Sequence, residues 1–126
     1  MIDRTFLYTE YFQSLERFNS SDIVWGYEPD VVYHFIQSGV TLASYHELGA
    51  ENESPLLAEL YLRQIYFAMI EAIRDPERSQ QFRHVCLNMI HEPLIALKRF
   101  YKRRHGGEQR FLSLQLELQR LQAPLD

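Results

Sequence analysis

The sequence predicts an all-α protein, a single domain that spans residues 1–126 and forms a bundle of about five helices kinked near Pro93. Two observations support this prediction. Apolar residues recur at steps of three and four along most of the chain, and this spacing brings side chains to one face of a helix. Prolines also stand where helices should begin, at Pro29, Pro55 and Pro76, because a first-turn proline needs no backbone donor.

The first helix is predicted from Asp3 to Phe18, where the larger apolar residues share one face. Asp3 or Thr5 can cap its start, because both side chains carry oxygens that accept a backbone hydrogen bond. Residues 19–22 have the sequence Asn-Ser-Ser-Asp. Their side chains can hydrogen-bond to nearby backbone groups in place of the helical bonds, so a turn is predicted there.

The middle of the chain predicts one interrupted helix and one strong helix. From Pro29 to Leu48 the apolar pattern weakens at Gly39, so we expect a kink or two short helices there. A further helix is predicted from a cap at Ser54 to Arg74. It is apolar around most of its circumference, which is typical of the central helix of a bundle or of half an interface.

The last third of the chain predicts a kinked helix and a terminal helix. Asp75–Glu77 has the order of a cap followed by proline, so a helix should begin there and continue to Arg104. Pro93 should kink or restart it near residue 92, and the following Gly106-Gly107 should stop it. In residues 111–121 the leucines alternate with polar residues as in a strand, but apolar residues also recur at the spacing of a helix. The content of Leu, Gln, Glu and Arg favours the helix.

Charge and composition narrow the classes of function. The net charge of −4 and the pI near 5.7 do not favour attraction of the whole molecule to nucleic acid or to an anionic membrane, although a local patch could still bind them. Cys86 is the single cysteine, which excludes an internal disulfide and fits a reducing compartment. The sequence shows no membrane span, no secretion signal, no metal-ligand spacing and no cofactor fingerprint, so a cytoplasmic protein without metal or cofactor is expected.

Two segments have an arginine followed six residues later by a histidine: Arg78 with His84, and Arg99 with His105. In a small helical bundle this spacing resembles the active-site motif of HEPN-type ribonucleases, and Ser79 supplies the polar residue that follows the arginine in that family. The resemblance implies a metal-independent ribonuclease that pairs the arginine and histidine of two subunits. Histidine would move the proton, and arginine would stabilise the phosphate charge.

The segment 98–105 concentrates positive charge and interleaves it with aromatic residues. Such a segment can bind single-stranded nucleic acid, because bases stack on rings while cations neutralise phosphates. It can also complement the negative end of a helix, or dock an acidic partner protein. The cations of this basic patch are Lys98, Arg99, Lys102, Arg103 and Arg104.

Two further stretches are candidate protein-binding surfaces. One is an aromatic N-terminal face, made of Tyr8, Tyr11, Phe12, Trp25 and Tyr27. The other is the leucine-rich terminal helix, represented by Leu114, Leu118 and Leu121. Large rigid side chains of this kind are enriched at protein interfaces, and an apolar surplus on a small chain favours self-association.

These observations predict a small bacterial-style regulator or adaptor that is not an enzyme. We expect it to act by binding another protein, as an anti-activator, chaperone or inhibitor does, and to form a homodimer. The ribonuclease with Arg78 and His84 is one alternative function. Nucleic-acid binding through 98–105 is the other, and we expect no membrane partner.

Overall fold

The computed structural model describes residues 3–47 and 50–122. These residues form α-helices joined by turns, and no strand is present among them. The prediction of an all-α bundle is therefore confirmed. Leu48, at which the sequence placed the end of the second helical stretch, lies outside the described residues. The helical segments are α1 (Arg4–Phe18), α2 (Glu28–Tyr45), α3 (Pro55–Arg74), α4 (Gln80–Met89), α5 (His91–Lys102) and α6 (Gly107–Gln122).

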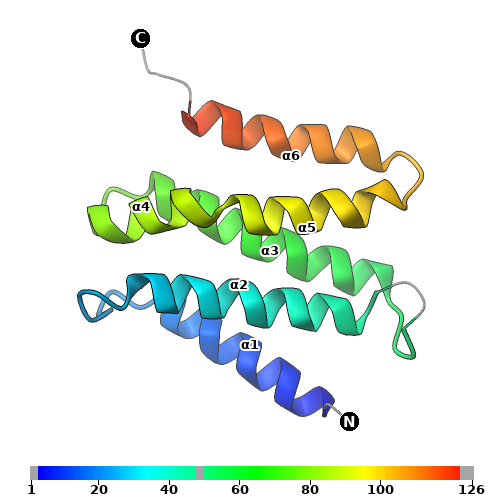
Figure 1. Ribbon diagram of the computed structural model, residues 1–126, viewed down its shortest axis with the longest axis horizontal. Coiled ribbons are helices and arrows are strands. Elements are labelled where there is room, and N and C mark those ends of the chain that lie inside the picture. The colour runs from blue at the N-terminus through cyan, green and yellow to red at the C-terminus, as the bar shows by residue number, and fades with distance from the viewer. Residues whose placement is uncertain (1–2, 48–49, 123–126) are drawn as a thin grey trace.

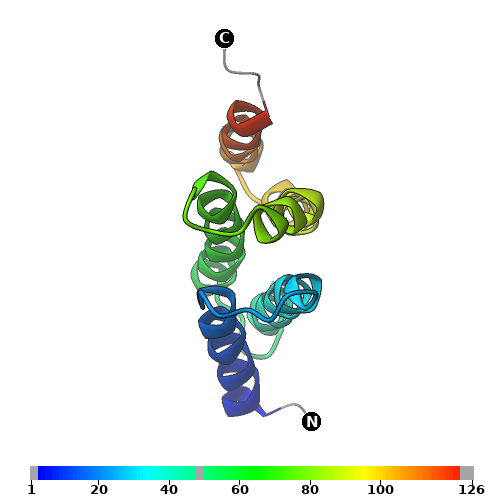
Figure 2. The same ribbon diagram turned by 90° about the vertical axis from the view of Figure 1, so that its left-hand side faces the viewer.

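The helices lie in two layers (Figures 1 and 2). Viewed along the helices, α1, α3 and α6 form one layer, and α2 with α4 and α5 forms the other. Of the two roles expected for the third helix, the packing of α3 against α2, α4 and α5 agrees with the central helix of a bundle. Many of the aromatic side chains lie in the core. The fully buried rings are those of Tyr11, Phe18, Phe35, Tyr66, Phe82 and Tyr101.

Side-chain caps mark the helix starts, and one predicted start was wrong. Asp3 accepts the backbone N–H of Thr5 at the start of α1, as expected. Asp75 instead ends α3 and closes a turn by accepting the backbone N–H of Glu77 at 2.9 Å. α4 begins only at Gln80, where Ser79 caps the helix. A cap residue followed by proline fits a tight turn as well as a helix start.

The interruption predicted at Gly39 is absent, because α2 is one continuous helix. The glycine lies where α2 meets its neighbours: a Cβ at this position would overlap the side chain of Ile65 in α3 and lie 3.0 Å from the ring of Tyr11 in α1. Gly39 therefore serves close helix packing, and this benefit outweighs its low helix propensity.

The break expected near Pro93 is confirmed, since Ile90 separates α4 from α5 and Pro93 lies in the first turn of α5. Counted as one kinked helix, α4 and α5 bring the total among the described residues to the five expected. α5 ends at Lys102, two residues before the predicted Arg104. The chain then reverses at Gly106, whose φ of +73° favours glycine. The terminal segment is the helix α6, as predicted.

Candidate functional site

The aromatic residues of α1 that the sequence assigned to a binding surface lie mainly inside the bundle. Tyr11 is fully buried, and its hydroxyl donates to Oε1 of Gln64 in α3 at 2.5 Å. Tyr8 is half-buried, and its hydroxyl lies 2.8 Å from Nε2 of the buried His46. Phe12 alone of the three is exposed. Tyr11 therefore holds α1 against α3 and is not part of a surface of this chain.

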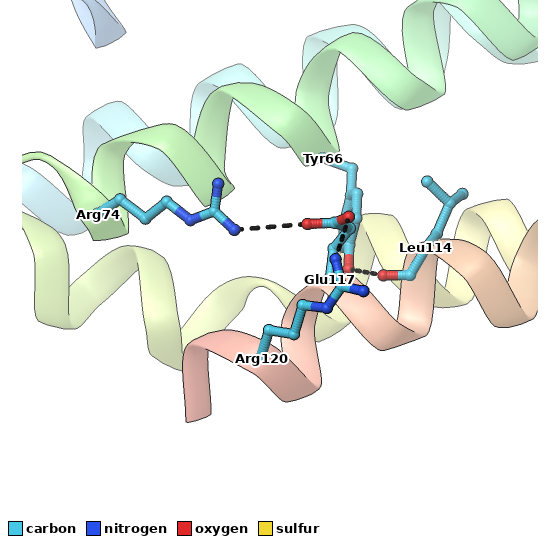
Figure 3. Close-up of polar contacts among 5 residues, drawn as sticks. All are labelled: Tyr66, Arg74, Leu114, Glu117 and Arg120. Atoms are coloured by element: carbon cyan, nitrogen blue, oxygen red, sulfur yellow. Dashed lines mark hydrogen bonds and ion pairs between the residues drawn. The ribbon is translucent and has the colours of Figure 1, made fainter. Parts of the chain in front are cut away.

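The three leucines predicted as the second surface face inward. Leu114 and Leu118 are buried, and Leu121 is half-buried against the core. Figure 3 shows how α6 is fixed there: the hydroxyl of Tyr66 in α3 donates to the backbone oxygen of Leu114 at 2.5 Å. Placing these leucines on the surface was therefore wrong for the chain as folded here, because α6 docks with this face.

The outward face of α6 holds two leucines that the sequence reasoning missed. Leu112 is 54% exposed and Leu116 is 45% exposed. They are four residues apart, so they share a face of the helix. The same spacing relates Leu114 to Leu118, and sequence spacing therefore could not tell which pair is buried.

Trp25 and Tyr27, the other two members of the predicted aromatic face, lie in the turn between α1 and α2. Trp25 is 83% exposed, and Val24 and Tyr27 beside it are exposed as well. The loop lies at the end of α1 opposite to the half that carries Tyr8 (Figure 1). The five predicted aromatics thus do not form one surface.

The turn that carries Trp25 is held by two hydrogen bonds. The backbone N–H of Tyr27 donates to the oxygen of Val24 at 3.0 Å, and that of Gly26 donates to Oε1 of Glu28 at 2.8 Å. Gly26 has a φ of +96°, as the third residue of a type II turn requires. Glu28 itself is buried in the first turn of α2. The indole is therefore presented on an ordered backbone.

A cavity of about 560 Å³ adjoins this turn. Its apolar walls are Ile23, Val24, Tyr27 and the buried Val31, and its polar members include Arg17 and Asp22. An apolar cavity beside an exposed, oriented tryptophan is the arrangement that interfaces use, in which a rigid anchor of one protein lies next to a pocket for a side chain of the other. We name residues 23–27 the Trp25 turn.

The structure assigns Arg78 to packing. Its Nη2 donates to the backbone oxygen of Phe18 at 2.6 Å, and its guanidinium carbon lies 3.9 Å from the ring centroid of Phe82. Burial lowers the pKa of this guanidinium. His84 is exposed and two residues beyond Phe82, which places it about 160° away around α4. Within one chain, the arginine and histidine of the ribonuclease motif therefore point apart.

The basic patch lies at the end of α5 and in the turn that leads to α6. Lys98, Arg99, Lys102 and Arg103 are exposed, whereas Arg104 is half-buried. Arg99 and Arg103 lie with Glu47 around a small cavity of about 100 Å³. The second arginine–histidine pair, Arg99 with His105, belongs to this exposed region.

A wider groove of about 930 Å³ lies between the end of α5 and the start of α6. One wall carries the cations Lys98 and Lys102, and the turn adds Arg104 and His105. The other wall is formed largely by the first two turns of α6, and its apolar members include Phe111 and Leu112. A Cβ at Gly107 would collide with the backbone oxygen of Tyr101, so glycine allows α5 and α6 to meet closely below the groove.

The single cysteine of the sequence lies in the core. Cys86 is buried, and desolvation raises the pKa of its thiol to about 12, which keeps it protonated and unreactive near neutral pH. Among the described residues, no three His, Cys, Asp or Glu side chains gather as metal ligands. In the same residues, no helix is long and apolar enough to cross a bilayer.

Comparison with protein-family models, curated proteins and solved structures gave no match to the chain. The geometry of the exposed side chains is therefore the basis of the functional argument.

Proposed function

We propose that this chain is a non-enzymatic regulator or adaptor of the cytoplasm that acts by binding another protein, and that the Trp25 turn is its contact with that partner. The observation that carries the proposal is the 83% exposure of an indole on an ordered turn. Tryptophan is among the residues most enriched at the energetic centre of interfaces. Because the turn is held by Gly26 and Glu28, little conformational entropy remains to be lost on binding.

The proposal includes a homodimer, which the exposed apolar residues beside the contact of α1 and α3 support. Leu56 and Leu60 are exposed and one turn apart on α3. Leu60 stands one turn before Gln64, which accepts the Tyr11 hydroxyl of α1. Phe12, next to Tyr11, is exposed too. Two copies that pack along this edge would cover apolar surface that otherwise faces water.

The partner contact is tested by affinity capture of the tagged full chain, with quantitative mass spectrometry of the bound proteins. Trp25→Ala should lose a specific partner that the wild type retains. Tyr33→Ala is the matched control, because Tyr33 is an exposed aromatic residue on α2 outside the turn. Glu28→Gln should weaken capture as well, because a neutral amide is a weaker acceptor for the Gly26 N–H.

The capture result is checked with the purified partner by fluorescence. Trp25 is the only tryptophan, so the tryptophan fluorescence of the chain, excited selectively over its tyrosines, reports on this turn alone. A partner seated on the turn should shield the indole from acrylamide quenching. Equal capture by the wild type and Trp25→Ala, together with unchanged quenching, would contradict the proposal.

The homodimer is tested separately by light scattering coupled to gel filtration. The wild type should show twice the chain mass of 15.1 kDa. Leu60→Asp should shift it to the monomer mass, whereas Ile95→Asp, an equally exposed apolar position on α5, should not. A wild type that stays monomeric at high concentration removes the dimer from the proposal and leaves the Trp25 contact standing.

A further inference from the structure

Positive charge is concentrated at one end of this acidic protein. The segment 98–105 contains five Lys and Arg residues and no Asp or Glu. Removing these five charges from the net charge of −4 leaves −9 on the rest of the chain. The end of α5 thus differs in sign from its surroundings, and it can attract an acidic ligand that the remainder of the molecule repels.

The groove beside this segment combines that charge with a wall that is apolar in part, because Phe111 and Leu112 stand there beside Glu108, Gln109 and Gln115. Lys98 and Lys102 are one turn apart and share a face of α5. Across the groove stands Leu112, and Leu116 follows one turn later along α6, so an apolar stripe extends beyond the groove. A ligand that fits both walls needs carboxylates along one side and apolar side chains along the other.

The aromatic rings of this region are buried or half-buried, and a cation lies near two of them. The Nζ of Lys98 lies 6.0 Å from the ring centroid of Phe111, and the guanidinium of Arg104 lies 5.0 Å from that of Phe100. The ring of Tyr101 is buried, and its hydroxyl donates to Glu59 in α3. Proteins that bind single-stranded nucleic acid instead present free ring faces to successive bases. The observations therefore favour a polypeptide ligand over RNA.

We propose that the groove between α5 and α6 binds an acidic amphipathic helical segment of a partner protein. Apolar side chains at steps of three and four would pack on the exposed Leu112 and Leu116. Carboxylates on the flank would face Lys98 and Lys102. This is the mode in which an amphipathic helix lies in a groove, with charge complementarity that sets its orientation.

This binding site goes beyond the proposed Trp25 contact and is independent of it. The Trp25 turn lies between α1 and α2, and the groove lies at the turn between α5 and α6, at the opposite end of the molecule (Figure 1). Failure of one proposal therefore leaves the other intact.

The test uses the full chain and a fluorescently labelled synthetic peptide of about 15 residues, long enough for four helical turns. The peptide carries leucines at steps of three and four and glutamates on the flanking positions. A second peptide has glutamine in place of every glutamate, and a third probe is a single-stranded RNA oligonucleotide. Binding is measured by fluorescence polarisation at low and moderate salt.

The double variant Lys98→Glu/Lys102→Glu should weaken binding of the acidic peptide at least tenfold. Leu112→Gln should weaken it with little change in salt dependence, because it removes apolar contact and no charge. Arg17→Glu is the matched control, because it reverses an exposed cation beside the Trp25 turn and should leave peptide binding unchanged. Retained helical circular dichroism shows that each variant is folded.

Several outcomes would overturn the proposal. These are no binding of the acidic peptide by the wild type, equal binding of the glutamine peptide, and equal or tighter binding of the RNA. A fourth is a change of oligomeric mass in Lys98→Glu/Lys102→Glu, because the groove would then be occupied by a second copy of this chain. Trp25→Ala should bind the peptide as the wild type does.

Discussion

The hydroxyl of Tyr66 is the clearest single polar link between α3 and α6, and its removal can be predicted in some detail. Tyr66 is fully buried, and it donates to the backbone oxygen of Leu114 (Figure 3). The change Tyr66→Phe deletes this bond and keeps the ring, so it creates no large cavity. A buried hydrogen bond contributes about 1 kcal/mol net, and we expect this loss in the free energy of unfolding. The melting temperature should fall by roughly 4 °C.

The effect should be concentrated in α6. Besides its packing on α5, this helix is linked to α3 by solvent-accessible ion pairs, such as Arg74 with Glu117 at 3.4 Å, which contribute little. Hydrogen exchange should therefore accelerate about fivefold in the amides of α6, with smaller changes in α2. Tyr8→Phe is the control, because it removes a hydroxyl from α1 that bonds to His46 far from α6.

Unchanged stability in Tyr66→Phe, within a few tenths of a kcal/mol, would refute this reasoning. So would a loss of stability with exchange rates that rise equally in every helix, because α6 would then unfold only together with the whole bundle.

Three further perturbations follow from the packing. Gly39→Ala should lower the free energy of unfolding by about 1–3 kcal/mol in urea denaturation, because the new methyl group overlaps Ile65. This cost should exceed the gain from the better helix propensity of alanine, and a more stable variant would contradict the reasoning. Burial raises the pKa of Cys86 from 9.0 and that of Tyr66 from 10.0, each to about 12, so both groups lose their protons at lower pH in the unfolded state than in the folded state. The free energy of unfolding, measured by urea midpoints, should therefore be constant up to pH 9 and fall between pH 9 and 12. Cys86→Ala should make this fall less steep. Ser79→Ala should cost about 1 kcal/mol through loss of the cap of α4, seen as faster hydrogen exchange in its first turn only.

The sequence predicted the helices well wherever local chemistry decides. Asp3 and Ser54 cap α1 and α3 through bonds to backbone N–H groups a few residues ahead, and such caps are readable from residue type. The wrong prediction of a helix start at Asp75 also came from assigning caps by residue type. Its side chain bonds two residues ahead in a turn, and Ser79 offers equivalent capping chemistry four residues later, so residue type did not discriminate between the two positions.

The exposure of the candidate site residues was less predictable, because it is set by tertiary contacts. In α6, Leu112 with Leu116 and Leu114 with Leu118 have identical spacing, and only the position of α3 and α5 decides which pair is buried. Arg78 is a second case in which tertiary contacts decide. Its spacing from His84 could not reveal that its guanidinium packs on the ring of Phe82. Trp25 was named only as one of five aromatics of a single predicted face, and its exposure on a separate turn follows from the fold.

Both proposed binding sites are built on glycine turns, and this bears on whether the proposed function is that of an inhibitor or of an adaptor. Gly26 and Gly106 are the two residues with positive φ among those described, one beside Trp25 and the other in the turn that borders the groove. Each turn joins two packed helices, so each surface is fixed without support from the other. An inhibitor needs one such surface, whereas an adaptor needs two that can be occupied together. Since the two turns lie at opposite ends of the bundle, Trp25→Ala should weaken capture of the ligand of the Trp25 turn only, and Lys98→Glu/Lys102→Glu should weaken binding of the groove ligand only. Separate losses of this kind would favour an adaptor that holds two ligands. One partner weakened by both changes, with additive effects on its binding free energy, would instead favour a single extended partner that spans the molecule.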